Sequence, residues 1–339
     1  MTAFSAQASH CSFLNEKQEK KSWHGLLLLN KIPGITSFDS LKVVKRAFGT
    51  GKAGHTGTLD KFAQGLLLVL VGRGVKLAPL FDNNDKEYTG TIKFGEETDT
   101  LDPEGRIIAT GRLPSLRDIE EVLPSFMGNI LQAPPSYSAV HVNGERAHEL
   151  ARRGVEPEMK KRPVTVYNLE LISWTPGEAV INAKVSSGTY IRSLARDIAL
   201  AAGSRAYLSA LTRTSVGKFH INDAVSCSFN ALEFEETENL RKALLSLDWK
   251  LFKTLSLPVF LLEENGVKGF FDGLPLEISI LKKGEFYFPA DDYASSTGNE
   301  VWPEKTVAGV FRKINPGDLL GIIEYKSGKW SYAHVFRDS

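Results

Sequence analysis

The chain has 339 residues, 42% of them hydrophobic, and carries 41 lysine and arginine side chains against 40 aspartate and glutamate side chains. This length allows a large core and indicates two domains, while the net charge of +1 excludes a uniformly basic molecule. No run reaches the ~20 apolar residues of a membrane helix, and the polar residues 1–23, expected to be a mobile tail, resemble no signal peptide. The two cysteines, Cys11 and Cys227, form no metal-binding cluster, which argues against zinc and fits a reducing cytoplasm.

The first predicted elements are a strand over residues 26–29 and a helix that follows Thr36, which can form a capping box with Asp39. A glycine-rich segment, residues 49–60, ends in Asp60. It is not a Walker A phosphate loop, because Ala53 follows Gly51-Lys52 where serine or threonine is required.

The apolar run 66–71 then predicts a buried strand. Asp60 is therefore expected at the mouth of a rigid element, where a carboxylate can act as a nucleophile or base. An ordinary glycine-rich connection with an aspartate at a turn is the alternative.

Further along the chain, residues 88–94, 165–174 and 179–186 alternate as strands do, and residues 189–202 predict a helix. The acidic run 99–104 lacks calcium-loop spacing and is better explained as a turn. Residues 132–163 form a long polar insertion rich in proline and basic residues, which is either functional or a solvated surface loop.

A domain boundary is expected in the acidic stretch 232–250. Beyond it, β-like segments such as 307–310 and 319–325 suggest a small barrel or sandwich. The predicted organisation is a mixed-sheet α+β domain over residues 24–250 and a small β-rich domain over residues 251–339.

Basic residues gather in two segments, 31–76 and 184–218, despite the balanced total. Local positive surface of this kind suits a polyanion such as RNA. A solvated basic face without a ligand is the alternative for each segment taken alone.

The sequence Gly-His-Thr-Gly-Thr-Leu-Asp at residues 54–60 resembles the signature loop of the TruB family of tRNA pseudouridine synthases. Further segments resemble that family's other motifs in the same order, so the resemblance covers roughly residues 25–225. These segments are 25–37, 86–102, 134–147, 187–197 and 211–219.

The resemblance implies a pseudouridine synthase-like catalytic domain in which the insertion grips RNA, and a C-terminal module weakly similar to the PUA type. It implies that a uridine in the T arm of tRNA, conventionally numbered 55, is detached at its N-glycosidic bond, rotated and rejoined through C5. This isomerisation needs no cofactor and no metal. The implied molecule is a cytoplasmic monomer with tRNA as its partner and no obligate protein partner.

Three other functions stay open at this point. A non-catalytic RNA-binding or tRNA-folding protein would not need Asp60. An RNA or nucleoside glycosidase would release free uracil, and a ribosomal-RNA pseudouridine synthase working with a guide RNA would share the same core motifs.

The resemblance also assigns roles to individual residues. Asp60 matches the catalytic aspartate, Arg192 its ion-pair partner, and Tyr190 the tyrosine that contacts the base and takes the C5 proton. The predicted substrate- and RNA-binding residues are Tyr88, which stacks on uracil, His55, which helps hold the flipped-out loop, Leu211 as an apolar wall with Lys76 beside it, and Lys31, Arg146 and Arg213 as phosphate contacts.

Three positions depart from the family pattern. Lys61 stands where proline usually follows the catalytic aspartate, which removes a fixed φ and adds a charge. Ser186-Ser187 stands in place of a Cys-Ser-Lys pattern, and Thr212 stands where arginine is usual. The last two changes each remove an expected cation.

Overall fold

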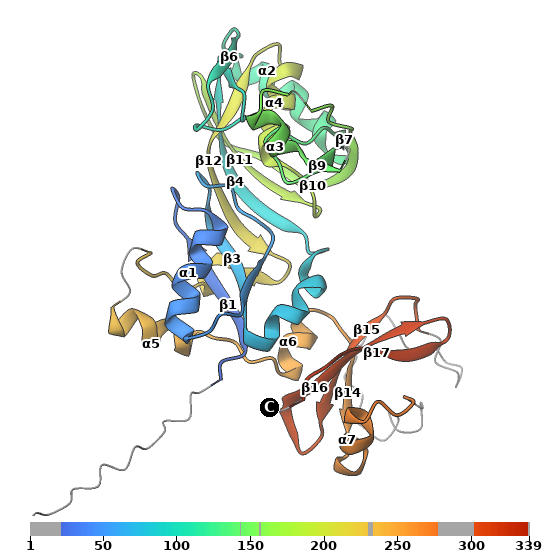
Figure 1. Cartoon of the computed structure of the whole chain (residues 1–339). Helices are drawn as coiled ribbons and strands as arrows, with labels where there is room; N and C mark the ends of the chain where they lie inside the picture. Colours follow the sequence, from blue (N-terminus) through green and yellow to red (C-terminus); the bar gives the residue numbers. More distant parts are fainter. Residues whose placement is uncertain (1–21, 143, 156, 230–232, 277–301, 338–339) are drawn as a thin grey trace, which may run out of the picture.

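The computed structural model describes residues 22–142, 144–155, 157–229, 233–276 and 302–337 (Figure 1). Residues 1–21 of the expected tail lie outside this set. Among the described residues, no helix is both long and apolar enough to cross a membrane.

A mixed nine-stranded sheet forms the centre, as the sequence predicts for the larger domain. Its strands follow the order β1-β3-β12-β4-β11-β10-β7, with β2 paired to β3 and β13 to β12. They are β1 (Gly25–Lys31), β2 (Ala53–Thr56), β3 (Gln64–Val71), β4 (Lys86–Phe94), β7 (Gly128–Gln132), β10 (Arg162–Thr175), β11 (Glu178–Val185), β12 (Ala206–Val216) and β13 (Phe219–His220).

Strands β3 and β12 are the one parallel pair of this sheet in the described chain, and they meet at Gly65 and Arg213. Gly65 has φ +108, and a Cβ at this position would lie 2.4 Å from the Arg213 carbonyl oxygen. Only glycine allows this approach. The close contact joins the strand after Asp60 to the strand that carries Leu211.

The helices of this part are short. They are α1 (Ser37–Phe48), α2 (Leu116–Val122), α3 (Ala147–Arg152), α4 (Ile191–Ala201) and α5 (Phe234–Lys242), with 3₁₀ turns η1 (Gly72–Phe81), η2 (Leu123–Phe126) and η3 (Ile221–Asp223). Helix α1 begins as predicted, since the Thr36 side chain accepts a hydrogen bond from the Asp39 N–H. Such a cap satisfies one of the unpaired donors of the first turn.

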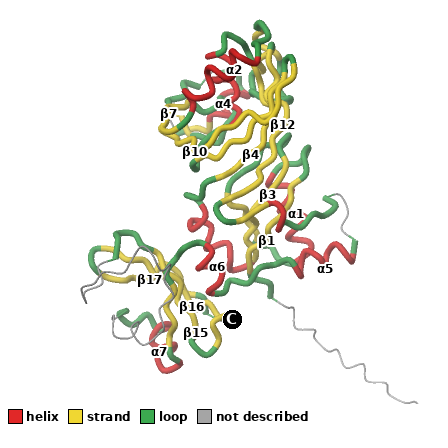
Figure 2. Tube along the Cα trace, turned by 180° about the vertical axis from the view of Figure 1, so that it is seen from behind, coloured by secondary structure: helices red, strands yellow, loops and turns green. Residues whose placement is uncertain are grey.

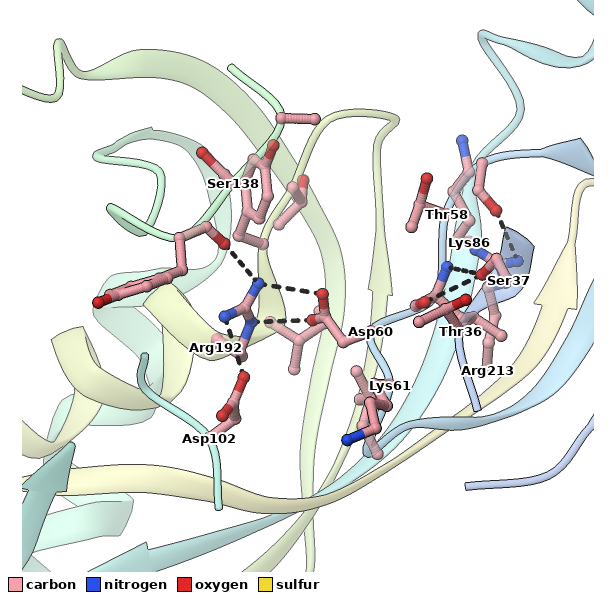
Figure 3. Close-up of a pocket in the computed structure, with 18 of the residues that line it drawn as sticks. Thr36, Ser37, Thr58, Asp60, Lys61, Lys86, Asp102, Ser138, Arg192 and Arg213 are labelled. Carbon is pink, nitrogen blue, oxygen red and sulfur yellow. Dashed lines mark hydrogen bonds and ion pairs between the residues drawn. The ribbon is translucent and has the colours of Figure 1, made fainter. Parts of the chain in front are cut away.

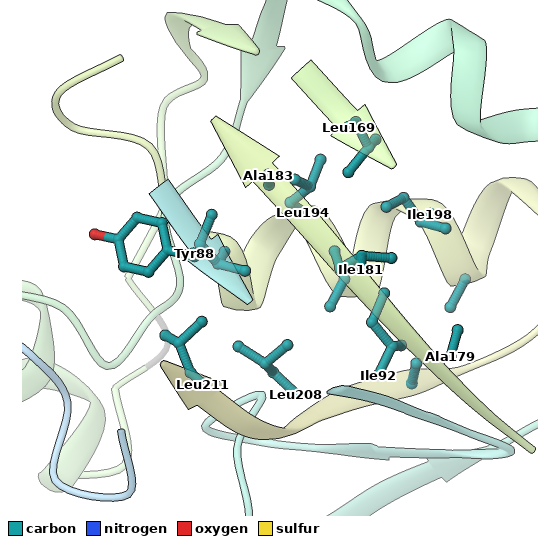
Figure 4. Packing of buried hydrophobic residues seen from close by; sticks show 14 of the residues in the cluster. Tyr88, Ile92, Leu169, Ala179, Ile181, Ala183, Leu194, Ile198, Leu208 and Leu211 are labelled. Atoms are coloured by element: carbon teal, nitrogen blue, oxygen red, sulfur yellow. The ribbon is translucent and has the colours of Figure 1, made fainter. Parts of the chain in front are cut away.

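Helix α4 buries its predicted apolar stripe against the sheet. Figure 4 shows Leu194 and Ile198 packed over Ile92, Ile181 and Leu208, all of which are buried. Tyr88 and Leu211 lie at the edge of this cluster, and the Tyr88 hydroxyl points away from it. The core therefore places an aromatic ring and a leucine side chain at the border of the apolar interior.

The expected insertion leaves the sheet between β7 and β10, whose residues Gln132 and Arg162 pair at its base. It contains the hairpin of β8 (His141–Val142) and β9 (Glu145–Arg146), followed by α3. A separate hairpin, β5 (Glu96–Thr98) and β6 (Ile107–Thr110), flanks the acidic turn at residues 99–104.

The C-terminal part contains a second sheet, ordered β14-β15-β16-β17. Its elements are α6 (Trp249–Thr254), β14 (Val259–Leu262), α7 (Glu264–Phe271), β15 (Val307–Arg312), β16 (Asn315–Lys326) and β17 (Lys329–Val335). Figures 1 and 2 place this sheet at the opposite end of the molecule from α2 and β6.

The two sheets share one apolar cluster, which includes Leu26, Leu68, Phe252, Phe311 and Phe336. Helix α6 lies across the expected boundary at residue 250 and contributes Phe252 to this cluster. Both expected strands, 307–310 and 319–325, fall within β15 and β16. The exact domain limits stay a prediction.

Candidate active site

A cavity of about 850 Å³ opens where the start of α1, the loop after β2, the start of β4, the insertion and the start of α4 meet (Figure 3). Seven of the residues predicted from the sequence line it: His55, Asp60, Tyr88, Tyr190, Arg192, Leu211 and Arg213. Residues far apart in the chain therefore converge on one site.

The loop that carries Asp60 is fixed by buried hydrogen bonds on both sides. The Ser37 hydroxyl donates to the Leu59 carbonyl (3.0 Å) and accepts from the Leu59 N–H (2.9 Å). The Lys31 ammonium donates to the Ala63 carbonyl at 2.6 Å. These bonds hold the backbone on either side of Asp60 and thereby orient its carboxylate.

Arg192 joins two carboxylates. Its Nε lies 2.8 Å from Asp60 Oδ2 and its Nη2 lies 3.0 Å from Asp60 Oδ1, while its Nη1 lies 3.1 Å from Asp102 Oδ2. The carbonyls of Thr100 and Tyr137 accept further bonds from the guanidinium at 2.7 and 3.1 Å. A planar fork of donors suits such multiple, directed contacts.

The two carboxylates differ in access. The Asp102 side chain is 8% exposed and that of Arg192 is 5% exposed, whereas Asp60 retains 35% exposure. Asp60 is therefore the carboxylate of the pair that a ligand in the cavity can reach.

Burial raises the pKa of Asp60 above its usual range, and the nearby charge of Asp102 acts in the same direction. The Arg192 guanidinium opposes this rise by favouring the charged carboxylate. The result is a partly desolvated carboxylate with one strong cationic partner, an environment that suits nucleophilic or basic chemistry.

Tyr190 caps the start of α4, and its backbone is held by Gln132. The Gln132 amide accepts from the Tyr190 N–H at 2.8 Å and donates to the Tyr190 carbonyl at 3.1 Å. Burial raises the pKa of the Tyr190 phenol, so it stays protonated at neutral pH. Burial and the charge of Arg213 together lower the pKa of His55, which favours the neutral imidazole.

Two predicted phosphate contacts are interior residues. Lys31 is fully buried, and its ammonium also donates to the carbonyls of Ile32 and Ile35; burial lowers its pKa to about 8. A phosphate contact does not fit this position, which instead holds the Asp60 loop. Arg213 is 1% exposed and donates to the carbonyls of Leu66 and Gly57, although it still borders the cavity.

Two other predicted binding residues lie outside the cavity lining. Lys76 was expected beside the uracil pocket, but the structure places it on η1 with its ammonium 5.5 Å from the centre of the Phe336 ring. The 3₁₀ turn carries it toward the C-terminal sheet. Arg146 is exposed and precedes α3 in the insertion, so a phosphate contact there stays a prediction.

Reasoning from the sequence missed Ser37, Asp102 and Lys86, all of which line the cavity. Asp102 does form the expected turn, because its carbonyl accepts from the Gly105 N–H at 3.3 Å. Because the turn already accounted for an aspartate at this position, nothing in the sequence gave reason to expect its contact with Arg192. Lys86 gave one usable signal, since it lies two residues before Tyr88 on one strand and thus shares its face.

Lys61, the residue in place of the usual proline, forms an ion pair with Glu104 at 2.8 Å across the cavity rim. The Asp60 carbonyl accepts from the Ala63 N–H at 3.2 Å, so Lys61 occupies the second position of a tight turn. The described residues contain no group of three or more His, Cys, Asp or Glu side chains able to hold a metal ion.

Residues 45–191 match the model of the TruB family pseudouridylate synthase N-terminal domain. The chain is 47% identical over 229 residues to a tRNA pseudouridine synthase B of Borreliella burgdorferi (strain ZS7), an alignment that covers 66% of this chain and 78% of that protein. It is 42% identical over 235 residues to a tRNA pseudouridine synthase B of Aquifex aeolicus, covering 68% and 80%.

Among solved structures, an H/ACA RNP bound to a substrate RNA containing 2′-deoxyuridine matches with a TM-score of 0.64 and 19% identity. The match covers 93% of this chain and 85% of the other. At this identity the likeness concerns the fold, and it supports the predicted mixed-sheet architecture.

Proposed function

Because this chain belongs to the TruB family of pseudouridylate synthases, we propose that it converts the T-loop uridine of tRNA conventionally numbered 55 to pseudouridine. The observation that carries the proposal is the Asp60–Arg192 ion pair, open to a cavity that Tyr88, Tyr190 and Leu211 also line.

The target base enters the cavity unstacked from its RNA loop. Extrusion of a base costs a few kcal/mol, and each base–aromatic stack contributes ~1–3 kcal/mol. The Tyr88 ring, which stands at the edge of the core with Leu211 beside it, can therefore offset much of that cost.

Asp60 acts on the bound uridine as a nucleophile or as a base toward the sugar. The N1–C1′ bond breaks, the uracil turns, and a C5–C1′ bond forms. The C5 proton then leaves and N1, freed from the sugar, gains a proton, so no atom is gained or lost. Arg192 keeps Asp60 ionised and fixes the direction of its two oxygens.

Tyr190 receives the C5 proton in this scheme. Because burial keeps its phenol protonated, it serves by relay: the oxygen accepts one proton as its own passes to a neighbouring acceptor. The proton released by the phenol passes to water in the open cavity and from there to N1, which gains a proton in the product.

Curated relatives at 42–47% identity carry the name tRNA pseudouridine synthase B, which favours tRNA over ribosomal RNA as the substrate. The match to the H/ACA RNP concerns the fold alone. A cytoplasmic location, a monomeric state and the absence of an obligate protein partner stay predictions.

The test is to incubate the protein with an unmodified tRNA transcript and to map pseudouridine by base-specific chemistry. We expect product at the T-loop uridine with RNA mass unchanged, and none from Asp60→Asn. Release of free uracil would instead indicate a glycosidase. Intact binding without product from the unaltered protein would indicate a non-catalytic RNA-binding protein.

A further inference from the structure

The cavity extends well beyond the space that a uracil ring needs. Its volume of about 850 Å³ lies near the upper end of the ~300–1,000 Å³ typical of sites for drug-sized ligands. Figure 3 shows Lys86 and Arg213 on one side of the cavity and Asp60, Arg192 and Asp102 on the other. The site therefore has room for more of the nucleotide than its base.

The ammonium of Lys86 has only neutral acceptors around it. It donates to the Ser187 hydroxyl at 3.2 Å and is 3.5 Å from the Asp82 carbonyl. Ser187 in turn donates to the same carbonyl at 2.6 Å. Within the described part of the chain, no carboxylate forms an ion pair with Lys86; those of Asp82 and Asp85 act on it only through their more distant charge.

A second cation, Arg213, adds to this positive end. Its guanidinium binds the carbonyls of Leu66 and Gly57, which are also neutral. Burial and the charge of Arg213 lower the pKa of Lys86, as expected where positive charge is left without a counter-charge. At the other end of the cavity, the carboxylates of Asp60 and Asp102 share the one guanidinium of Arg192. That end therefore carries more negative than positive charge.

We propose that Lys86, with Ser187 beside it, binds a backbone phosphate of the RNA next to the target uridine; this rests on the proposed function. With uracil at Asp60, the ribose spans the cavity and its phosphate reaches the positive end. A phosphate would give Lys86 a charge-assisted hydrogen bond, and the Ser187 hydroxyl can turn from the Asp82 carbonyl to donate as well. Arg213 contributes charge without leaving its carbonyl partners.

The first experiment measures affinity for a synthetic T-arm stem-loop over a range of salt concentrations, in an Asp60→Asn background that prevents turnover. Adding Lys86→Met should weaken binding about tenfold or more. It should also lower the slope of log affinity against log salt by ~0.7, the value for one single-strand phosphate. Lys93→Met is the matched control, because Lys93 lies on the same strand with Glu96 as its partner; we expect no change.

The second experiment locates the phosphate. Each phosphate flanking the target uridine is replaced in turn by a neutral methylphosphonate. At one position the replacement should weaken binding to the protein that keeps Lys86 and leave binding to the Lys86→Met variant unchanged. The Lys86→Arg variant, which keeps the positive charge, should show the same weakening as the protein with Lys86. Equal penalties at every position with and without the Lys86→Met substitution, with both proteins folded by circular dichroism, would overturn the inference.

These outcomes separate the inference from the proposed function. Pseudouridine formation that depends on Asp60, without coupling between Lys86 and any phosphate, would reject the phosphate site alone. Coupling without product would reject the enzymatic proposal and leave an RNA-binding site at Lys86.

Discussion

Arg192 is the residue on which the geometry of the site depends. It contacts Asp60 and Asp102 with separate nitrogens and is almost completely buried. Such a cation holds its position only while both carboxylates stay charged, and each carboxylate is stabilised by it in return. Position and protonation state are therefore linked within this triad.

The first consequence concerns pH. Because burial raises the pKa of Asp60 above its ordinary 3.8, and the charged form is required, kcat/KM should fall as pH drops through that raised value. Asp102→Asn removes a charge that raises this pKa and should move the acid limb to lower pH; Arg192→Lys weakens the opposing contact and should move it higher. Single-turnover rates measured across pH test this. If the acid limb of the pH–rate profile were the same in the unaltered protein and in both variants, Asp60 would not be the group that sets it.

The second consequence concerns stability. Arg192→Met leaves two carboxylates facing each other in a desolvated site, and breaking a buried pair in this way costs ~3–5 kcal/mol. Urea unfolding should show that loss. Adding Asp60→Asn and Asp102→Asn to the same protein should recover part of it, and no recovery would mean that the charges are not its cause.

At the scale of elements, the sequence predicted much of the framework. The cap at Thr36, five of the nine strands of the central sheet and the stripe of α4 follow from local pattern, because capping and burial act over a few residues. Asp60 and Arg192 lie 132 positions apart, and only the family resemblance joined them. The parallel pairing at Gly65 and the position of Lys76 gave no local signal, since both are set by packing between distant segments.

At Gly65 the backbone of β3 packs tightly against that of β12. An added methyl group would meet the Arg213 carbonyl at 2.4 Å in a backbone conformation that side chains rarely adopt. We expect Gly65→Ala to cost ~2–3 kcal/mol or more and to lower activity by displacing the Asp60 loop from Leu211. Gly51→Ala, which has open space around it, is the control in urea unfolding and should change little. Equal effects would contradict the role of Gly65.

The turn at Asp60–Ala63 can accept proline at its second position. Among the backbone hydrogen bonds of the described loops and turns, none is donated by the Lys61 N–H, which proline would lack. The Lys61 carbonyl accepts from the Gly34 N–H at 2.8 Å, and proline would keep this acceptor. Lys61→Pro should therefore leave the urea midpoint unchanged or slightly raised. A marked loss of stability would mean that the ion pair with Glu104 contributes more to holding this loop than the turn does.

At the scale of the whole molecule, one apolar cluster joins the central sheet to the C-terminal sheet. Phe252 and Phe311 pack edge to face at 5.2 Å between ring centres, and both are fully buried. Residues of the C-terminal part thus complete the apolar packing against β1 and β3 of the central sheet. The two sheets are expected to unfold together.

Phe311→Ala tests that coupling. Truncation of a buried phenylalanine costs ~3–5 kcal/mol, and the loss should appear in one unfolding transition that includes the central sheet. Phe234→Ala, at a position that is 82% exposed, should have no effect. An early transition confined to the C-terminal part would show that the sheets fold separately.

The Lys61–Glu104 pair spans two half-exposed side chains at the cavity rim, and salt screens such charges over ~3 Å at 1 M. Ionic strength should then have two effects. It should change the affinity for RNA, and it should change how firmly the loop that carries Asp60 is held in the complex. When the protein is in excess and all the RNA is bound, any remaining salt dependence of the rate reports how firmly the Asp60 loop is held. The Lys61→Pro variant, which lacks the ion pair, should not show this dependence.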